Sequence, residues 1–204
     1  MTESTSSTSL TATFAGPTQQ GDLLVLSASV YTGLTNQITR VTDSAGNTWT
    51  KIGAFSTSGH YSDGELWYSP NAAAVTSVTA TVGTATVLAV EVAEFSGVAV
   101  VNPLDGFAGT SNTGTTANSG SANPTGPADL AVAFIAGHGS SQAIAVTSTG
   151  FSTLPQQTSS NAGSTTASVI VGYKVLNPAT AQDFAGGFSS GMYWAAGIAV
   201  FKSA

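Results

Sequence analysis

Apolar and polar residues along the chain follow the short-period pattern of β-strands. Residues 76–82 (TSVTATV) alternate with a period of two, which places Val78, Ala80 and Val82 on one face of a strand. No window combines a 3.6-residue period with helix caps. The pattern predicts an all-β protein whose strands are separated by Gly, Asn, Ser and Pro turns. Further strands rich in apolar and β-branched residues are predicted at 22–31, 86–95, 129–137, 168–176 and 192–202.

Short motifs recur in the two halves of the chain. Asp22 in GDLLV corresponds to Asp129 in ADLAV, 107 positions later. WYSPNA, which begins at Trp67, resembles YKVLNP, which begins at Tyr173, 106 positions later. AVEVAEF and AAGIAVF form a third pair at the same spacing. Three anchors in one order and at nearly one spacing predict an internal repeat.

Two arrangements of the repeated halves agree with the sequence: two small domains, or two interleaved halves of one jelly roll. Segment 102–127 is a Gly/Ser/Thr/Asn-rich connection by composition, although the apolar residues within 98–107 indicate that the chain first packs onto the body. The second-half strands are apolar on both faces and favour partners on both sides. We therefore expect one domain over 1–204, a jelly-roll-like antiparallel β-sandwich built from pseudo-repeats of about 9–97 and 127–202.

The amino-acid composition argues against some classes of binding partner. Only 7% of the 204 residues are charged, against roughly 25% in an average protein. The four basic residues, Arg40, Lys51, Lys174 and Lys202, are too scattered to replace counterions on phosphates. Nucleic acid is therefore excluded as a partner, and the same scarcity of basic residues argues against an anionic membrane surface. A polar but weakly charged surface is common in extracellular and particle-forming β proteins.

The chain also lacks the features of several other classes. It has no cysteine, so disulfides, zinc–thiolate sites and thiol catalysis are absent. Its first residues, MTESTSSTSL, have neither a basic region nor an apolar run, so we expect no signal peptide. No stretch approaches the roughly 18 apolar residues of a membrane span, and membrane insertion is not expected.

The ordered motifs GDLLVLSASVY, VTDSAGNTWTKIG, ELWYSPNA, LAVEVAEFSGV and PADLAVAFIAG together resemble a known family. They are similar to jelly-roll surface modules of secreted bacterial proteins and of actinobacterial phage minor tail proteins. The resemblance covers about Ser9 to Lys202 and implies a β-sandwich displayed on an exterior surface. It implies no biochemical activity and transfers no residue role.

The stretch DSAGN, at 43–47, is the candidate metal site. Asp43 and Asn47 offer the oxygen ligands that calcium takes, but the stretch contains a single carboxylate and no EF-hand spacing. The same residues are typical of a turn, in which Asp and Asn bond local backbone N–H groups. We favour the turn. A calcium site would need a second acid from a distant loop, such as Asp22, Asp63 or Asp105.

Other titratable residues do not form a catalytic set. Glu91 and Glu94 lie on opposite faces of one strand, so they do not act together as an acid–base pair. Glu94 shares the apolar face and needs a partner, for which Arg40, Lys51 or backbone N–H groups of the turn at 96–97 are candidates. A Lys–Asn crosslink templated by this acid is a further alternative.

Histidine and serine chemistry is also not indicated. His60 and His138 fall in separate predicted loops and do not make a metal site by themselves. No G-x-S-x-G elbow is present, and we predict that the protein is not an enzyme.

Aromatic side chains are the remaining candidates for recognition, because sugars stack their C–H faces on exposed rings. Adjacent residues of a strand face opposite sides, so one ring of Trp67–Tyr68 and one of Tyr193–Trp194 should be exposed or at an interface. The alternative is that these rings pack in the core. The predicted ligand-binding residues are Asn47, Trp49, Tyr61, Trp67, Tyr68 and Trp194.

The sequence therefore predicts a non-enzymatic surface or virion module, structural or adhesive, without a cofactor. It would act by display and by contact with copies of itself or with a host surface. The expected location is extracellular or on a virion, in a homo-oligomer or larger assembly. The alternative is a carbohydrate-binding module for cell-surface glycans, with calcium assisting.

Overall fold

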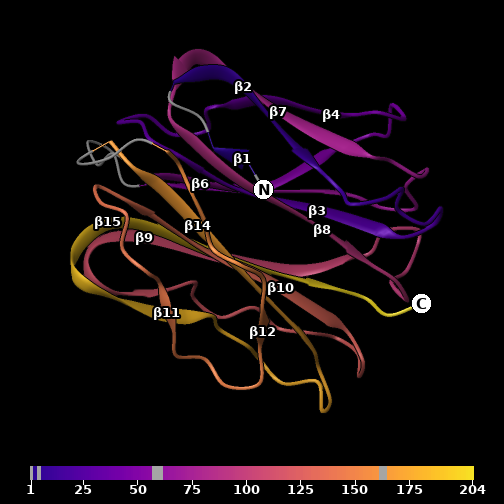
Figure 1. Cartoon of the computed structure of the whole chain (residues 1–204). Coiled ribbons are helices and arrows are strands. Elements are labelled where there is room, and N and C mark those ends of the chain that lie inside the picture. The colour runs from indigo at the N-terminus through magenta and orange to yellow at the C-terminus, as the bar shows by residue number, and fades with distance from the viewer. Residues whose placement is uncertain (1, 4–5, 57–61, 161–164) are drawn as a thin grey trace.

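The computed structural model describes residues 2–3, 6–56, 62–160 and 165–204, and every regular element in them is a β-strand (Figure 1). The prediction of an all-β antiparallel sandwich is confirmed. The strands of the first half are β1 Thr2–Glu3, β2 Ser7–Thr13, β3 Leu23–Val30, β4 Ile38–Asp43, β5 Thr50–Ser56, β6 Asp63–Ser69, β7 Ser77–Thr86 and β8 Leu88–Phe95. Those of the second half are β9 Leu104–Asn118, β10 Leu130–His138, β11 Ala145–Val146, β12 Ser152–Thr153, β13 Gln157–Thr158, β14 Ala167–Val175 and β15 Ala185–Phe201.

The strands form three antiparallel sheets, and each sheet takes its described strands from one half of the chain. The first half supplies a five-stranded sheet, β1-β8-β3-β6-β5, and a three-stranded sheet, β2-β7-β4. The second half supplies the seven-stranded sheet, β11-β15-β10-β14-β12, with β9 paired to β15 and β13 paired to β14. In Figure 1 the three-stranded sheet lies at the top, the five-stranded sheet in the middle and the seven-stranded sheet below.

The centres of the two large sheets share one strand order and one register. β3 lies between β8 and β6, and β10 lies between β15 and β14. Leu23 is opposite Phe95 in the first sheet, and Leu130 is opposite Phe201 in the second. These pairs match the repeat spacing read from the sequence.

The second repeat anchor differs from the sequence alignment by one residue. Val25 is opposite Tyr68, and Val132 is opposite Tyr173, so Tyr68 rather than Trp67 corresponds to Tyr173. The alignment paired the wrong aromatic residues because it compared residue type without knowing the face of the strand. Tyr68 and Tyr173 both point into the layer between the large sheets, whereas Trp67 points to the opposite side.

That central layer is an apolar core shared by both halves. Phe134 lies at its middle, where Gly64 of the facing sheet and Gly197 of the neighbouring strand leave room for its ring. A Cβ would lie 2.6 Å from the Phe134 ring at Gly64 and 2.8 Å from it at Gly197. These glycines are therefore required for close packing of the ring, not for a turn.

Aromatic pairs bridge the two halves in equivalent ways. The rings of Tyr68 and Phe201 are 5.6 Å apart, and those of Phe95 and Tyr173 are 5.5 Å apart. Exchanging the halves converts one pair into the other, because Tyr68 corresponds to Tyr173 and Phe95 to Phe201. The two repeats therefore pack face to face in a pseudo-symmetric manner, as two copies do across an isologous interface.

Each large sheet is covered on its other face as well. The five-stranded sheet packs Leu24, Leu26 and Trp67 against the three-stranded sheet. The outer face of the seven-stranded sheet is covered by side chains of the second half that include Phe184 and Phe188. Burial on both faces explains why the central strands β10, β14 and β15 are largely apolar on both sides.

Segment 102–127, expected from its composition to be a connection, contains the 15-residue strand β9. This strand pairs with β15 along most of its length, because backbone groups form the ladder whatever the side chains are. Val98 is buried and Leu104 is half-buried, as expected for a segment that packs onto the body. Val101 and Phe107, in contrast, are 73% and 52% exposed.

The shared central layer predicts that the two halves unfold together, as a single domain over 1–204 requires. Phe134→Ala should lower the free energy of unfolding by about 3–5 kcal/mol. Urea titrations of W194F, which keeps the first-half tryptophans, and of W49F/W67F, which keeps the second-half one, would report each half. We expect the same urea midpoint in both tryptophan backgrounds. Phe134→Ala should shift this midpoint equally in both. A shift confined to the Trp194 signal would contradict it, and Leu34→Ala is the exposed control.

Candidate functional site

The turn after β4 uses its acid to hold its own backbone. Oδ1 of Asp43 accepts the N–H groups of residues 45–47 at 2.7 to 3.1 Å, and Oδ2 accepts the indole N–H of Trp49 at 2.7 Å. The Asn47 amide donates to the Ala73 carbonyl at 3.0 Å and accepts its N–H at 2.8 Å. The arrangement is the Asx-type turn expected from the sequence.

Protein donors thus engage both oxygens of the Asp43 carboxylate. Burial raises the pKa of Asp43, but the hydrogen bonds from Trp49 and the backbone outweigh it and leave the pKa lowered. Asp63 and Asp105 have other partners, Gln37 and Thr125 respectively. The described part of the chain contains no group of three His, Asp or Glu residues placed to hold a metal ion. Calcium at Asp43 and Asn47 stays a prediction.

The aromatic residues predicted to bind a ligand are distributed over three apolar clusters. Trp49 and Trp67 pack between the first-half sheets, Tyr68 in the central layer and Trp194 in the outer layer of the second half. Trp67 and Trp194 are buried, whereas Trp49 and Tyr68 are half-buried. Tyr61 lies outside the described residues. Neither ring of the Trp67–Tyr68 pair is exposed, because both faces of their sheet are covered.

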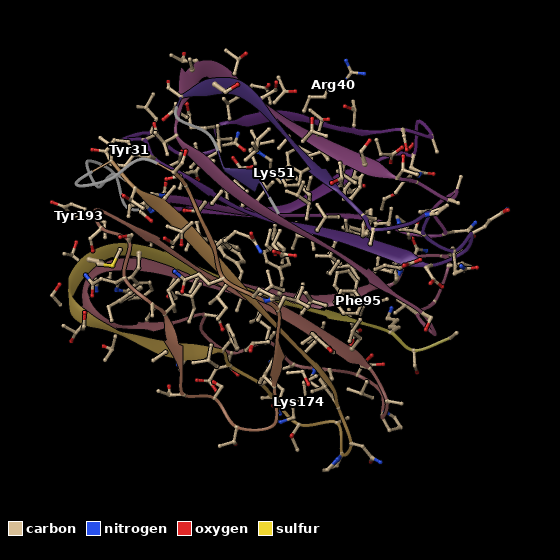
Figure 2. The ribbon with its side chains drawn as sticks, in the orientation of Figure 1. Tyr31, Arg40, Lys51, Phe95, Lys174 and Tyr193 are labelled. Carbon is tan, nitrogen blue, oxygen red and sulfur yellow. The ribbon has the colours of Figure 1, made fainter. Side chains whose placement is uncertain are left out.

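The acids of β8 have partners other than those expected. Glu94 accepts the backbone N–H of Gln19 rather than pairing with Arg40 or Lys51. Arg40 is exposed and points away from the body in Figure 2. Burial raises the pKa of Glu91, and a hydrogen bond with Gln157 of the second half only partly offsets the effect.

A group of polar side chains around two buried acids, which we call the acid–lysine cluster, lies in the first half of the chain. It comprises Asn36, Lys51, Asp63, Glu65 and Trp67. The Glu65 side chain is 0% exposed and its Oε2 lies 2.6 Å from Nζ of Lys51, which is 22% exposed. Nζ of Lys51 is 4.6 Å from the centre of the Trp67 ring, an arrangement that favours a cation. In Figure 2 Lys51 projects over the first-half strands, whereas Arg40 extends beyond them.

Hydrogen bonds tie this cluster to the chain that enters β4. Oε1 of Glu65 accepts the Ile38 N–H at 2.7 Å, and Oε2 accepts the Trp67 indole N–H at 2.9 Å. Oδ2 of Asp63 accepts the Gln37 N–H at 2.9 Å. Nζ of Lys51 donates to the Ile38 carbonyl at 3.0 Å.

Sequence reasoning missed this cluster, although one signal was available. Asp63 and Glu65 are two positions apart, so in a strand both point to the same face. With apolar residues on both faces, that face had to be buried. Burial, and after it the negative charge of Glu65, raises the pKa of Asp63 to about 7.

A second group of polar side chains lies where the two halves meet, at the ends of β3 and β10. Nε2 of His138 is 2.8 Å from Oγ of Ser29, and the His138 ring is 6.3 Å from that of Tyr31. Tyr31 and His138 are equivalent positions of the two repeats. His138 was expected in a loop, but it is the last residue of β10 and is fully buried.

Burial lowers the pKa of His138 to about 3, despite a weaker opposing hydrogen bond with the Val30 backbone, so the imidazole is neutral. Ser29 is also fully buried. A Ser–His contact alone does not make a nucleophile: a substrate must reach the hydroxyl, and an acid must orient the base. No salt bridge or hydrogen bond between an acid and His138 is present among the described residues.

A cavity of about 490 Å³ opens beside this pair. Tyr31 and Tyr193 lie at the same end of the body in Figure 2. The lining combines aromatic, hydroxyl and amide groups and contains no acid. Side chains around it include Tyr31, Thr113, Ser140, Gln142, Met192 and Tyr193.

Asp63 and His138 should make the free energy of unfolding depend on pH in opposite directions. Between pH 3.8 and about 7 the folded state keeps a proton on Asp63 that the unfolded state loses, so this residue makes stability fall as pH rises. Between about pH 3 and 6.5 the unfolded state holds a proton on His138 that the folded state excludes, so stability rises with pH.

Asp63→Asn should therefore steepen the loss of stability on acidification below pH 6.5, with a change in slope of up to about 1.4 kcal/mol per pH unit. Urea titrations from pH 4 to 8 would measure it. The same slope in the variant and the wild type would show that Asp63 ionises normally in the folded protein. Asp22→Asn, at a half-buried position, is the control.

No helix that could cross a membrane is found in the part of the chain described here. Comparisons with models of known protein families, with curated proteins and with solved structures give no match. The resemblance to jelly-roll surface modules therefore stays an inference from sequence motifs.

Proposed function

We propose that the protein is a non-enzymatic surface module, structural or adhesive, that acts by display and contact on an exterior or virion surface. The observation that carries this proposal is that several of its titratable side chains are engaged internally. Asp43 holds a turn, Glu65 pairs with Lys51, and Asp105 accepts hydrogen bonds from Thr125. His138 is buried and neutral. Chemistry on a substrate needs accessible groups of this kind, whereas display needs a rigid body with a polar surface.

Contact between copies of the chain is supported by the apolar residues that the cores leave exposed. Val100, Val101 and Phe107 lie within a stretch of eight residues that leads into β9, and each is about half exposed or more. In the described part of the chain β9 pairs only with β15, so it is an edge strand. Only 7% of residues are charged, so little repulsion opposes the approach of a second copy. We commit to a second copy as the occupant of this surface.

Sedimentation velocity over a concentration series tests this contact. The wild type should form dimers or larger species, and V101S/F107S should weaken association at least about tenfold, because exposed apolar anchors carry most of an interface's free energy. L34S/V175S, which changes exposed apolar residues elsewhere, should leave association intact. A wild type that stays monomeric at every concentration, or a V101S/F107S variant that associates normally, would contradict the proposed contact.

The second candidate function is binding of a cell-surface glycan, and the cavity beside His138 favours it. The rings of Tyr31 and Tyr193 and the amide of Gln142 are groups that sugars use for stacking and hydrogen bonding. This location differs from the residues expected from the sequence. We expect the wild type to bind on a glycan array. Tyr193→Ala should abolish this binding, and Trp49→Phe should preserve it. An array that stays blank at high protein concentration removes this function.

A further inference from the structure

The acid–lysine cluster contains the three groups of an amide-forming reaction. Nζ of Lys51 donates to Oδ1 of Asn36, so the amine lies against the side-chain amide. Oε2 of Glu65 lies 2.6 Å from the same nitrogen. A carboxylate beside an amine can remove its proton and then deliver a proton to a leaving group. The geometry points to a covalent bond: we propose that Lys51 and Asn36 form an intramolecular isopeptide crosslink, with Glu65 as the proton shuttle.

The atoms balance without an oxidant or cofactor. Lys51 transfers one ammonium proton to Glu65, and the neutral amine attacks Cγ of Asn36. Glu65 gives its proton to Nδ2 and takes another from the attacking nitrogen. The Cγ–Nδ2 bond then breaks, Nζ stays bonded to Cγ, and ammonia leaves. Ammonia carries three of the five protons away. Of the other two, one stays on the new amide nitrogen and one on Glu65.

The cluster also positions the amide. Asn36 has a positive φ of 62°, in the left-handed region that asparagine tolerates. The two residues that follow it are fixed by the acids, since Asp63 accepts the Gln37 N–H and Glu65 accepts the Ile38 N–H. The Ile38 carbonyl and the Trp67 ring hold the lysine on the other side. Attacking and attacked groups are thus held together before reaction, which is the main requirement of an intramolecular step.

The second repeat has no acid at the position equivalent to Glu65. Ala28 is opposite Glu65, and Ile135 is opposite Ile170, so Ile170 occupies the position equivalent to Glu65. Ile170 is buried in an apolar layer. Because a buried ion pair is often no more stabilising than apolar residues of similar volume, fold stability alone does not explain Lys51 and Glu65. A chemical role for this pair explains why both residues are present.

Lys174 provides a matched control within the chain. Its Nζ donates to the side-chain amide of Gln182 at 2.9 Å and lies 5.6 Å from the centre of the Phe151 ring. Among the described residues it has an amide and an aromatic ring but no salt bridge to an acid. If the acid is the essential group, Lys51 reacts and Lys174 does not.

Tryptic mapping of the full chain under denaturing conditions, with intact mass, tests the proposal. The chain has four trypsin sites, at Arg40, Lys51, Lys174 and Lys202. A crosslink lowers the intact mass by one ammonia, blocks cleavage after Lys51 and leaves peptide 1–40 joined to 41–174. Cleavage after Lys174 stays normal. An intact mass equal to that of the sequence, with free peptides 1–40 and 41–51, overturns the proposal, and so does simple deamidation of Asn36.

Variants assign the roles. Lys51→Arg and Asn36→Gly should each restore the full mass; glycine keeps the positive φ, and Asn36 is exposed, so the second variant should fold. Glu65→Gln, which keeps the shape but cannot shuttle a proton, should leave the chain uncrosslinked. If Glu65→Gln does not fold, the wild-type map and Asn36→Gly decide the matter. Loss of ammonia that persists in Asn36→Gly would place the bond elsewhere and contradict the assignment.

Discussion

The apolar layer between the five-stranded and seven-stranded sheets is the contact on which the rest of the structure depends. Each half of the chain presents one sheet to it, and the aromatic pairs Tyr68–Phe201 and Phe95–Tyr173 repeat the same contact with the halves exchanged. Hydrophobic burial of this kind is the dominant stabilising term in folding. The other face of each large sheet is covered as well, so most of their central strands are apolar on both sides.

This constraint also decides which polar groups are buried. A sheet covered twice has no solvated face for a charged residue, so Asp63, Glu65 and His138 are enclosed and each has a protein partner. The two repeats solve the same packing problem differently. The first half encloses acids and a lysine where the second half places an isoleucine, and this asymmetry separates what the fold needs from what is particular to the first half.

Much of the fold follows from the sequence, because strand periodicity and motif recurrence are local signals. The strands around Leu23, Val78, Leu88 and Leu130 are visible in the pattern, and the Asp43 turn is visible in its residue types. β9 was not predicted as a strand, because its Ser, Thr, Asn and Gly residues resemble those of a linker and its pairing with β15 is a long-range property.

The candidate sites were less predictable, because contacts between distant segments decide them. The pairing of Lys51 with Glu65 depends on β5 lying beside β6, and the meeting of Tyr31 with His138 depends on how the halves pack. Exposure of the aromatic rings was misjudged because alternation along a strand gives the face but not what covers it. Trp67 and Tyr68 do lie on opposite faces, yet each face is packed.

Native-state hydrogen exchange of β3 and β10 tests the central claim most directly. These strands are the centres of the two large sheets and face each other across the shared layer. If the layer joins the halves into one unit, amides of both strands should open with the same free energy, equal to that of global unfolding. Exchange of β3 through an opening that leaves β10 protected, or the reverse, would contradict the account.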